Sequence, residues 1–121
     1  MSKNIKWLDK PEEHDYPAAE AYLLLIYTDD EVKTIVNSLH DASMTTFKAK
    51  DIFRASSLHL LGISNSHVEK NLKKVSDGHS LSPILLVRDP INRKVVIADG
   101  YHRLCAAYSI SEDLDIPCKI V

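Results

Sequence analysis

Apolar residues between positions 29 and 41 recur at the spacing of an amphipathic α-helix. They fall every three or four positions and so share one helical face: Val32, Ile35, Val36 and Leu39. Thr28 and Glu31 precede them in the Thr-x-x-Glu arrangement of a capping box, in which each side chain bonds backbone at the helix start. The pattern therefore predicts a helix from about residue 29 to residue 41.

The chain before this helix has a weaker pattern. Residues 1–16 show no period, so we expect an extended arm. Residues 17–26 are rich in Ala and Leu, and Pro17 suits a first helical position, which favours a helix. A buried strand over residues 22–27 is the alternative, because a short apolar run fits either element.

The segment from residue 43 to Gly62 is expected to begin extended and to become helical near Ala49 or Lys50. Four residues repeat there at intervals of three and four, as on a helix: Ile52, Phe53, Ser56 and Leu60. Gly62 is typical of a residue that ends a helix, because glycine adopts the left-handed conformation easily.

Another helix is predicted over residues 66–77. Asn65 or Ser66 is suited to cap its start. Its apolar stripe consists of Val68, Leu72 and Val75. Gly78 follows directly and is expected to end it.

The pattern changes after position 80. Two β-rich runs, "SPILLVRD" and "KVVIAD", are separated by a turn and predict a β-hairpin. "YHRLCAAYSI" predicts a helix of about ten residues, and "IPCKIV" predicts a closing strand. A mainly helical half followed by a β-β-α-β core with a small mixed sheet makes α+β the expected class. We expect one domain over residues 1–121, with a helical extension over 1–63 and the core over 64–121.

Composition is compatible with a single globular domain. The chain has 121 residues, of which 45% are hydrophobic and 26% charged. The longest apolar run, from Ala21 to Tyr27, is far shorter than the ~20 residues of a spanning helix. No basic stretch followed by an apolar one opens the chain, so we expect a cytoplasmic protein without a membrane role. Cys105 and Cys118 do not make a disulfide framework and are expected to be reduced.

Charge is distributed unevenly. A formal net charge of -2 argues against a general nucleic-acid-binding protein. Acidic residues are concentrated between positions 9 and 31, whereas six bases lie between positions 48 and 74. Such a chain can bind an anion locally while remaining nearly neutral.

The turn "DGYHR", residues 99–103, is the strongest candidate for a binding site. Gly100 allows close approach of the backbone, and a helix starting near Tyr101 presents unpaired N–H groups that attract anions. Arg103 offers a fork of donors suited to phosphate. His102 and Asp99 are the candidate catalytic residues, since both can transfer a proton, and Asp99 could also cap the helix or hold a metal-bound nucleotide.

Each of these side chains also has a structural interpretation. Asp99 is a favourable helix cap, and Tyr101 suits the edge of a core. His102 is compatible with a structural histidine, and Arg103 with a surface pair to Asp113 or Asp115.

A second basic group is expected to help bind the ligand. Lys50 and Arg54 are four residues apart and share one helical face, so they would complete an anion pocket if this helix packs against the turn. His67 is a weaker candidate, and Lys70, Lys73 and Lys74 are expected to form an exposed stripe. The six histidines lack convincing metal-ligand spacing, so we expect no protein-held metal. A nucleotide would bring its own magnesium, held mainly by phosphates.

Residues 80–121 resemble the core of the ParB/sulfiredoxin superfamily. The similarity consists of a Pro-Ile strand, a hairpin, the Asp-Gly-x-His-Arg turn, a helix with small residues and a closing strand. Sulfiredoxins carry their catalytic cysteine directly before the histidine, where this chain has Tyr101, so sulfiredoxin activity is not expected. Partition proteins of this superfamily bind and hydrolyse CTP and bind DNA through a following helix-turn-helix domain, which we do not expect here, so a partition role is not expected. Similar archaeal free-serine kinases use an Asp-Gly-His-His-Arg turn.

These observations lead to three hypotheses. The first is a protein that binds a phosphate-bearing small molecule or nucleotide at the turn. The second is a small phosphotransferase or nucleotide hydrolase that uses Asp99 and His102. The third is a non-catalytic interaction module, in which the apolar "AYLLLIY" forms a homodimer or partner surface.

Overall fold

The computed structural model describes residues 4–59, 62 and 65–121. Within these residues the chain forms five helices and one four-stranded sheet, which confirms the α+β class. In chain order the elements are α1 (Asp15–Leu23), α2 (Asp29–Asp41), β1 (Thr45–Lys48), α3 (Ala49–Ser56), α4 (Ser66–Ser76), β2 (Ile84–Asp89), β3 (Lys94–Asp99), α5 (Tyr101–Ile110) and β4 (Asp115–Ile120). None of the helices in these residues has the length and apolar character needed to cross a membrane.

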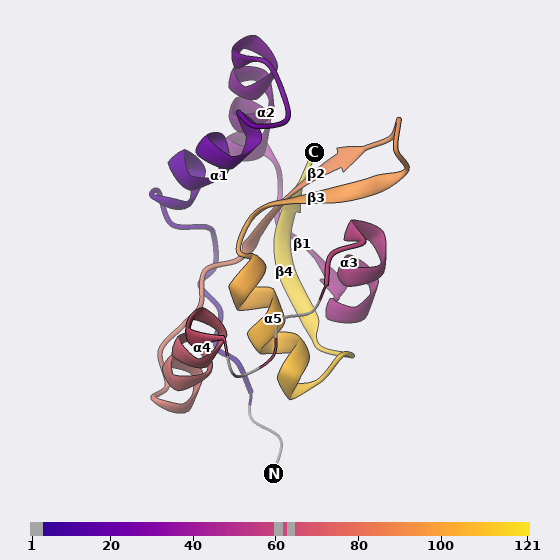
Figure 1. Cartoon of the computed structure of the whole chain (residues 1–121). Helices are drawn as coiled ribbons and strands as arrows, with labels where there is room; N and C mark the ends of the chain where they lie inside the picture. The colour runs from indigo at the N-terminus through magenta and orange to yellow at the C-terminus, as the bar shows by residue number, and fades with distance from the viewer. Residues whose placement is uncertain (1–3, 60–61, 63–64) are drawn as a thin grey trace.

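The sheet has the strand order β1-β4-β2-β3 (Figure 1). β2 and β3 form an antiparallel hairpin, and α5 then returns the chain so that β4 lies parallel to β2. β1 pairs antiparallel with the other side of β4. The sheet is therefore mixed, and the N-terminal half supplies one of its edge strands in addition to helices.

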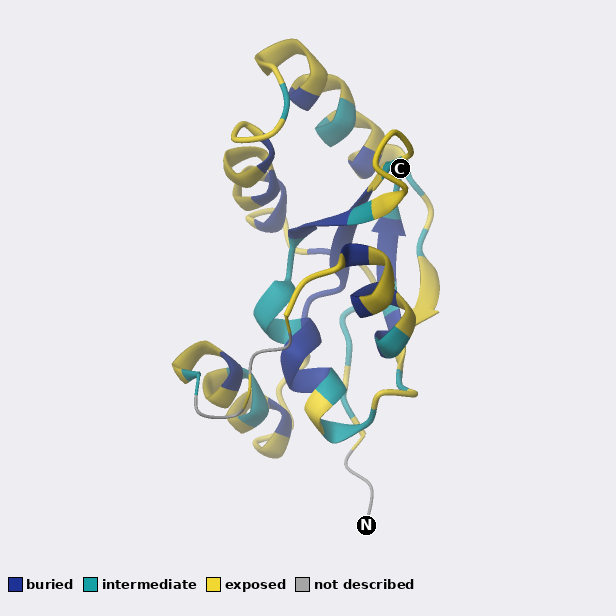
Figure 2. Cartoon of the chain, turned by 45° about the vertical axis from the view of Figure 1, so that its right-hand side comes forward, coloured by how far each residue is buried: buried dark blue, intermediate teal, exposed yellow. Residues whose placement is uncertain are grey.

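Helices cover both faces of the sheet, as Figure 2 indicates by the buried strands between helices with exposed outer surfaces. Side chains of β2 alternate between the two cores. Ile84 and Leu86 pack on one side with α3, α4 and α5, whereas Leu85 and Val87 pack on the other with α1 and α2. A strand buried on both faces reads as a continuous apolar run, which explains "ILLV" in the sequence.

Several predicted elements are confirmed. The helix over 29–41 has the predicted bounds, and both halves of its capping box form, since Thr28 accepts from the Glu31 N–H and Glu31 accepts from the Thr28 N–H. Asn65 caps α4 by accepting from two backbone N–H groups. The hairpin, the extended start before Ala49, the helix over 101–110 and the closing strand are also present.

Other boundaries differ from the prediction. α1 covers Asp15–Leu23 rather than 17–26, and the next residues form turns, so the alternative strand over 22–27 is wrong. α3 ends at Ser56 rather than at Gly62, because Ser57 adopts the left-handed conformation that glycine was expected to supply. Leu60, which the helical pattern included, lies outside the described residues.

Both cysteines are completely buried, and neither forms a disulfide within the described residues. Burial raises the pKa of the Cys118 thiol to about 11, so this thiol is protonated at neutral pH. Cys118 therefore acts as a small apolar core residue.

A single residue, Gly100, connects β3 to α5. Its φ of 103° lies in the region that favours glycine. A Cβ atom at this position would lie 2.4 Å from Ile84 Cδ1 and 2.9 Å from Arg103 Nη2. The connection therefore requires glycine for two reasons, the backbone conformation and the close packing of neighbouring side chains.

We predict that Gly100→Ala lowers the free energy of unfolding by roughly 2–4 kcal/mol, because strain from positive φ adds to overpacking. Gly78→Ala is the matched control, since Gly78 also has a positive φ, 79°, but open space around the added Cβ. Its expected loss is only about 1 kcal/mol. Urea denaturation measures both, and equal losses would contradict the packing argument.

Candidate functional site

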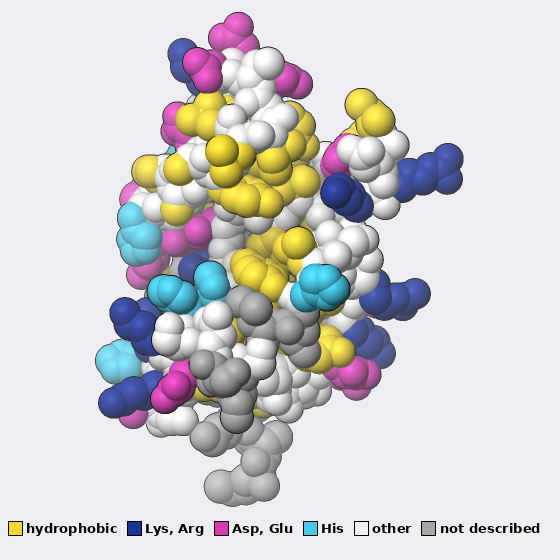
Figure 3. All heavy atoms as spheres, viewed as in Figure 1, with side chains coloured by type: hydrophobic (Ala, Val, Ile, Leu, Met, Phe, Trp, Pro, Cys, Tyr) yellow, Lys and Arg dark blue, Asp and Glu magenta, His cyan; other side chains and the backbone are white. Residues whose placement is uncertain are grey.

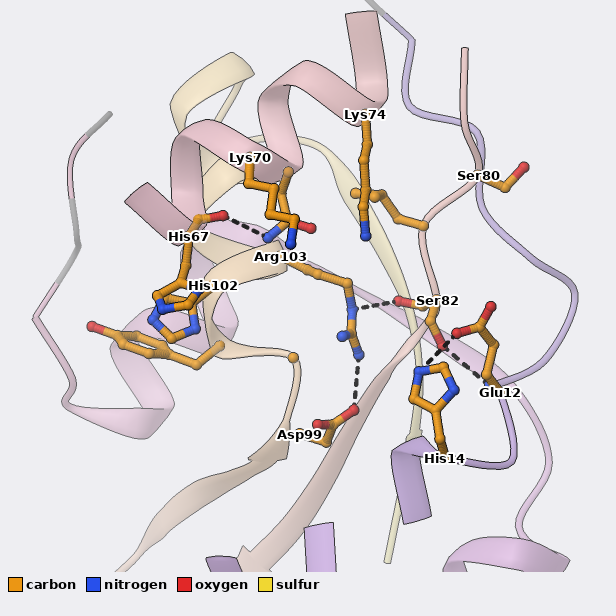
Figure 4. A pocket seen from close by; sticks show the side chains of 14 residues that line it. Glu12, His14, His67, Lys70, Lys74, Ser80, Ser82, Asp99, His102 and Arg103 are labelled. Atoms are coloured by element: carbon orange, nitrogen blue, oxygen red, sulfur yellow. Dashed lines mark hydrogen bonds and ion pairs between the residues drawn. The ribbon is translucent and has the colours of Figure 1, made fainter. Parts of the chain in front are cut away.

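A pocket of about 330 Å³ lies at the start of α5, between this helix, α4 and the segment that precedes α1. The DGYHR turn forms part of its wall. Figure 4 shows Lys70 and Lys74 on one side, and Glu12, His14 and Asp99 on the other. The turn singled out in the sequence therefore borders a concave, mostly polar site, which residues from the segment before α1, from α4 and from positions 80–82 complete.

The start of α5 presents backbone N–H groups without a side-chain cap. Gly100 occupies the cap position and provides no side-chain acceptor. The structural interpretation of Asp99 as the helix cap is therefore wrong. A helix start of this kind carries partial positive charge and favours an anion nearby.

Arg103 joins the end of β3 to the segment before β2. Its Nε donates to the Ser82 carbonyl oxygen at 2.9 Å, and Nη2 donates to Pro83 O at 3.3 Å and Asp99 Oδ2 at 2.9 Å. The side chains of Arg103 and Asp99 are only 18% and 15% exposed, so solvent screens this ion pair weakly. The alternative surface pair with Asp113 or Asp115 does not form.

Asp99 is close to a second buried carboxyl, that of Asp15. Burial is the main cause that raises the pKa of Asp99, the Arg103 guanidinium opposes this, and Asp15 adds to it. Asp15 Oδ2 accepts from the Glu12 N–H at 2.9 Å and from the Ser82 hydroxyl. Two carboxyl groups therefore meet beneath the pocket with the guanidinium of Arg103 bonded to Asp99.

His102 borders the pocket and lies beside His67 of α4, with ring centroids 4.8 Å apart. Burial, and to a smaller extent His67, lowers the pKa of His102. His102 is therefore neutral at pH 7 and can accept a proton or a hydrogen bond.

Tyr101 lies at the edge of the pocket, and its hydroxyl donates to the backbone carbonyl of His59. Burial raises the pKa of Tyr101, and Cys105 contributes in the same direction. Its phenol therefore stays protonated and links α5 to the segment after α3.

Lys50 and Arg54 do not join the turn. Lys50 Nζ lies 2.7 Å from Asp113 Oδ1, and Arg54 Nη1 lies 3.7 Å from Asp51 Oδ1. Neither residue lines the pocket. The expectation that they complete the anion pocket is not met, because α3 packs its apolar face on the sheet and directs these bases toward acidic neighbours and solvent.

The basic side of the pocket comes from α4 instead. One face of this helix carries four polar residues spaced by three and four: His67, Lys70, Asn71 and Lys74. Lys70 and Lys74 are exposed, as the sequence predicted, but they also line the pocket, which the sequence did not predict. The available signal was the spacing of the polar residues, which places them on one face beside Val68 and Val75. Across the described ranges, no carboxylate forms an ion pair with Lys70 or Lys74.

Glu12, His14 and Asp15 are the residues here that could hold a metal. One ligand atom from each lies within 4.8 Å of the others. Residues 1–16 were expected to form an extended arm, and no sequence pattern linked them to the turn. The chain order Glu-x-His-Asp was the available signal, but only the fold reveals that Ser82 and Asp99 adjoin it.

No family model, no curated protein and no solved structure matches this chain. The similarity to the ParB/sulfiredoxin superfamily stays a prediction from the sequence.

We predict that Arg103→Lys lowers the free energy of unfolding by about 2 kcal/mol or more. A lysine cannot satisfy Asp99 and two carbonyl oxygens with the geometry of a guanidinium, and buried acceptors without donors are costly. Arg54→Lys is the control, because Arg54 is 83% exposed and should change stability by less than about 0.5 kcal/mol. Chemical denaturation of both variants tests this, and a neutral Arg103→Lys would refute the structural role.

Proposed function

We propose that the pocket binds a phosphate-bearing small molecule or a nucleotide. The observation that carries this proposal is the position of Lys70 and Lys74, which face the uncapped start of α5 across the pocket. Amines and backbone N–H groups that converge on one concave site are the usual means of binding phosphate.

The electrostatics of the pocket support this function. Lys70 and Lys74 have no carboxylate partner in the part of the chain that the structure describes, so their charge is available to a ligand. The imidazoles of His67 and His102 also line the pocket and can donate hydrogen bonds to a ligand. Arg103 uses Nε and Nη2 for protein acceptors, which leaves Nη1 as the part of its guanidinium for a ligand.

The resemblance to the ParB/sulfiredoxin superfamily supports the same class of ligand. The turn that carries the resemblance, residues 99–103, lines the pocket. Nucleotide binding by members of that superfamily makes a nucleotide a suitable first probe. Magnesium would then enter with the nucleotide phosphates.

The proposed function is binding of the phosphate-bearing ligand, without phosphoryl transfer. Asp99, one of the two candidate catalytic residues, has an oxygen bonded to Arg103. Its role is therefore accounted for by holding the turn. His102 remains the residue of the pair that is free to contact a ligand.

An interaction surface would be compatible with this function. Figure 3 shows hydrophobic side chains gathered on one face of the molecule. The exposed apolar residues at and just after the end of α1 are Tyr22, Leu24, Leu25 and Ile26, and Leu25 is 83% exposed. None of them lines the phosphate pocket, so a partner bound there would leave the pocket accessible.

We predict that the double variant Lys70→Ala/Lys74→Ala weakens binding of pyrophosphate and of nucleoside triphosphates by about tenfold or more, because two partly exposed charged contacts together contribute roughly 1.4 kcal/mol or more. Isothermal titration calorimetry in the presence of EDTA measures this without bound metal ions. Lys73→Ala is the matched control, since Lys73 is on the same helix but does not line the pocket.

Wild-type protein that binds none of these probes would overturn the proposed function. So would a double variant that binds as tightly as wild type. A loss of equal size in Lys73→Ala would indicate attraction by overall charge rather than a defined site.

We also predict that anion binding tightens as the pH falls from about 8 to about 6. The pKa of His102 is lowered in the free protein, and a bound anion favours the imidazolium, so binding raises that pKa and takes up a proton. Sulfate is the suitable probe because it does not titrate in this range. His102→Asn should reduce the gain in affinity, whereas His79→Asn, outside the pocket, should retain it. A gain unchanged in His102→Asn would contradict the contact.

A further inference from the structure

We propose that Glu12, His14 and Asp15 form a binding site for a divalent transition-metal ion on the wall of the pocket. His14 Nε2 lies 3.0 Å from Glu12 Oε2 and 3.5 Å from Asp15 Oδ1. Glu12 and His14 line the pocket directly. The site departs from the expectation, drawn from histidine spacing, that the protein holds no metal.

The separations between these atoms suit a shared ion. Ligands at about 2.1 Å from one metal lie roughly 3.0–3.4 Å apart in octahedral or tetrahedral geometry. The two distances from His14 Nε2 are close to this range. All three ligand atoms lie within 4.8 Å of one another, so small side-chain rotations bring them onto one ion.

Asp15 is held in place before any metal binds. Its side chain is 3% exposed, and its Oδ2 accepts from the Glu12 N–H and the Ser82 hydroxyl. These contacts leave Oδ1 directed toward His14. A ligand oriented by hydrogen bonds from neighbouring residues is typical of built metal sites.

The local charge also favours a cation. Buried carboxylates are normally paired with a cation or coordinated to a metal. Arg103 pairs with Asp99, whereas His14 is the sole ion-pair partner of Glu12 and of Asp15 in residues 4–59, 62 and 65–121. Asp15 also adjoins the carboxyl of Asp99. A divalent ion would therefore neutralise a group of acids that the protein leaves in excess.

The donor set identifies the class of metal. One imidazole nitrogen with two carboxylate oxygens suits first-row ions such as Mn²⁺ and Zn²⁺ better than Mg²⁺ or Ca²⁺, which prefer oxygen alone. Three protein ligands leave coordination positions open on the pocket side. A phosphate oxygen of the ligand would occupy one of them, and this last step alone rests on the proposed function.

The test uses the metal alone. Mn²⁺ titration followed by electron paramagnetic resonance, and Zn²⁺ titration by calorimetry at about pH 7.5, should detect one ion per chain. Glu12→Gln and His14→Ala should each weaken binding at least tenfold. Glu13→Gln and His79→Ala are matched controls, because both residues are exposed and outside the group, and they should bind as wild type does. Circular dichroism confirms folding of every variant.

Wild-type protein without a saturable Mn²⁺ or Zn²⁺ site would overturn the inference. The contacts of His14 with Glu12 and Asp15 would then be side-chain pairs only. Equal losses in the control variants would do the same. Retained pyrophosphate binding in EDTA with no metal site would refute only the metal, whereas a metal site without anion binding would refute only the proposed function. If both hold, Mn²⁺ should tighten pyrophosphate binding in wild type but not in Glu12→Gln.

Discussion

The ion pair between Arg103 and Asp99 is the contact on which the site depends. Asp99 ends β3, and Arg103 lies in the first turn of α5, so the pair spans the single residue that joins strand to helix. The same guanidinium bonds the carbonyl oxygens of Ser82 and Pro83. Arg103 therefore links α5 to the end of β3 and to the segment before β2. Because the guanidinium is largely removed from water, the loss of any of its acceptors would leave a buried N–H donor without a partner.

This arrangement explains why the pocket needs residues from both halves of the chain. Ser82, placed beside Arg103, also donates to Asp15, and Asp15 begins the helix that covers the other face of the sheet. The acidic wall of the pocket thus comes from the N-terminal half, and the basic wall comes from α4. Residues 1–63, which read as an extension in the sequence, contribute an edge strand, the covering helices α1, α2 and α3, and part of the site.

The sequence predicted what depends on neighbouring residues. The Thr28 capping box, the Asn65 cap and the two β-rich runs separated by a turn are local signals, and each produced the expected element. The turn at residues 99–103 was also identified, because the succession Asp-Gly-Tyr-His-Arg is readable from the chain alone. Local chemistry was therefore sufficient for most of the core and for one wall of the pocket.

Long-range placement could not be read in the same way. Lys50 shares a helical face with Arg54, but the loop that carries Asp113 lies close enough to pair with Lys50, which no local pattern reveals. Lys70 and Lys74 are exposed as predicted, but their place at the pocket could not be read from the sequence, because the direction of a helical face depends on tertiary packing. The end of α3 at Ser57 was missed for another reason, since a serine adopted a conformation in which glycine is preferred.

The close packing of Arg103 over Gly100 has a consequence for the evolution of this chain. The Ile84 side chain and the guanidinium together occupy the space that a larger residue at position 100 would need, and the guanidinium charge is balanced by the carboxylate of Asp99. Replacing one of the three alone leaves a clash, an unbalanced charge or an unfilled gap. In divergent homologues, the acid, the glycine and the arginine should therefore covary as a triplet, retained together or exchanged together.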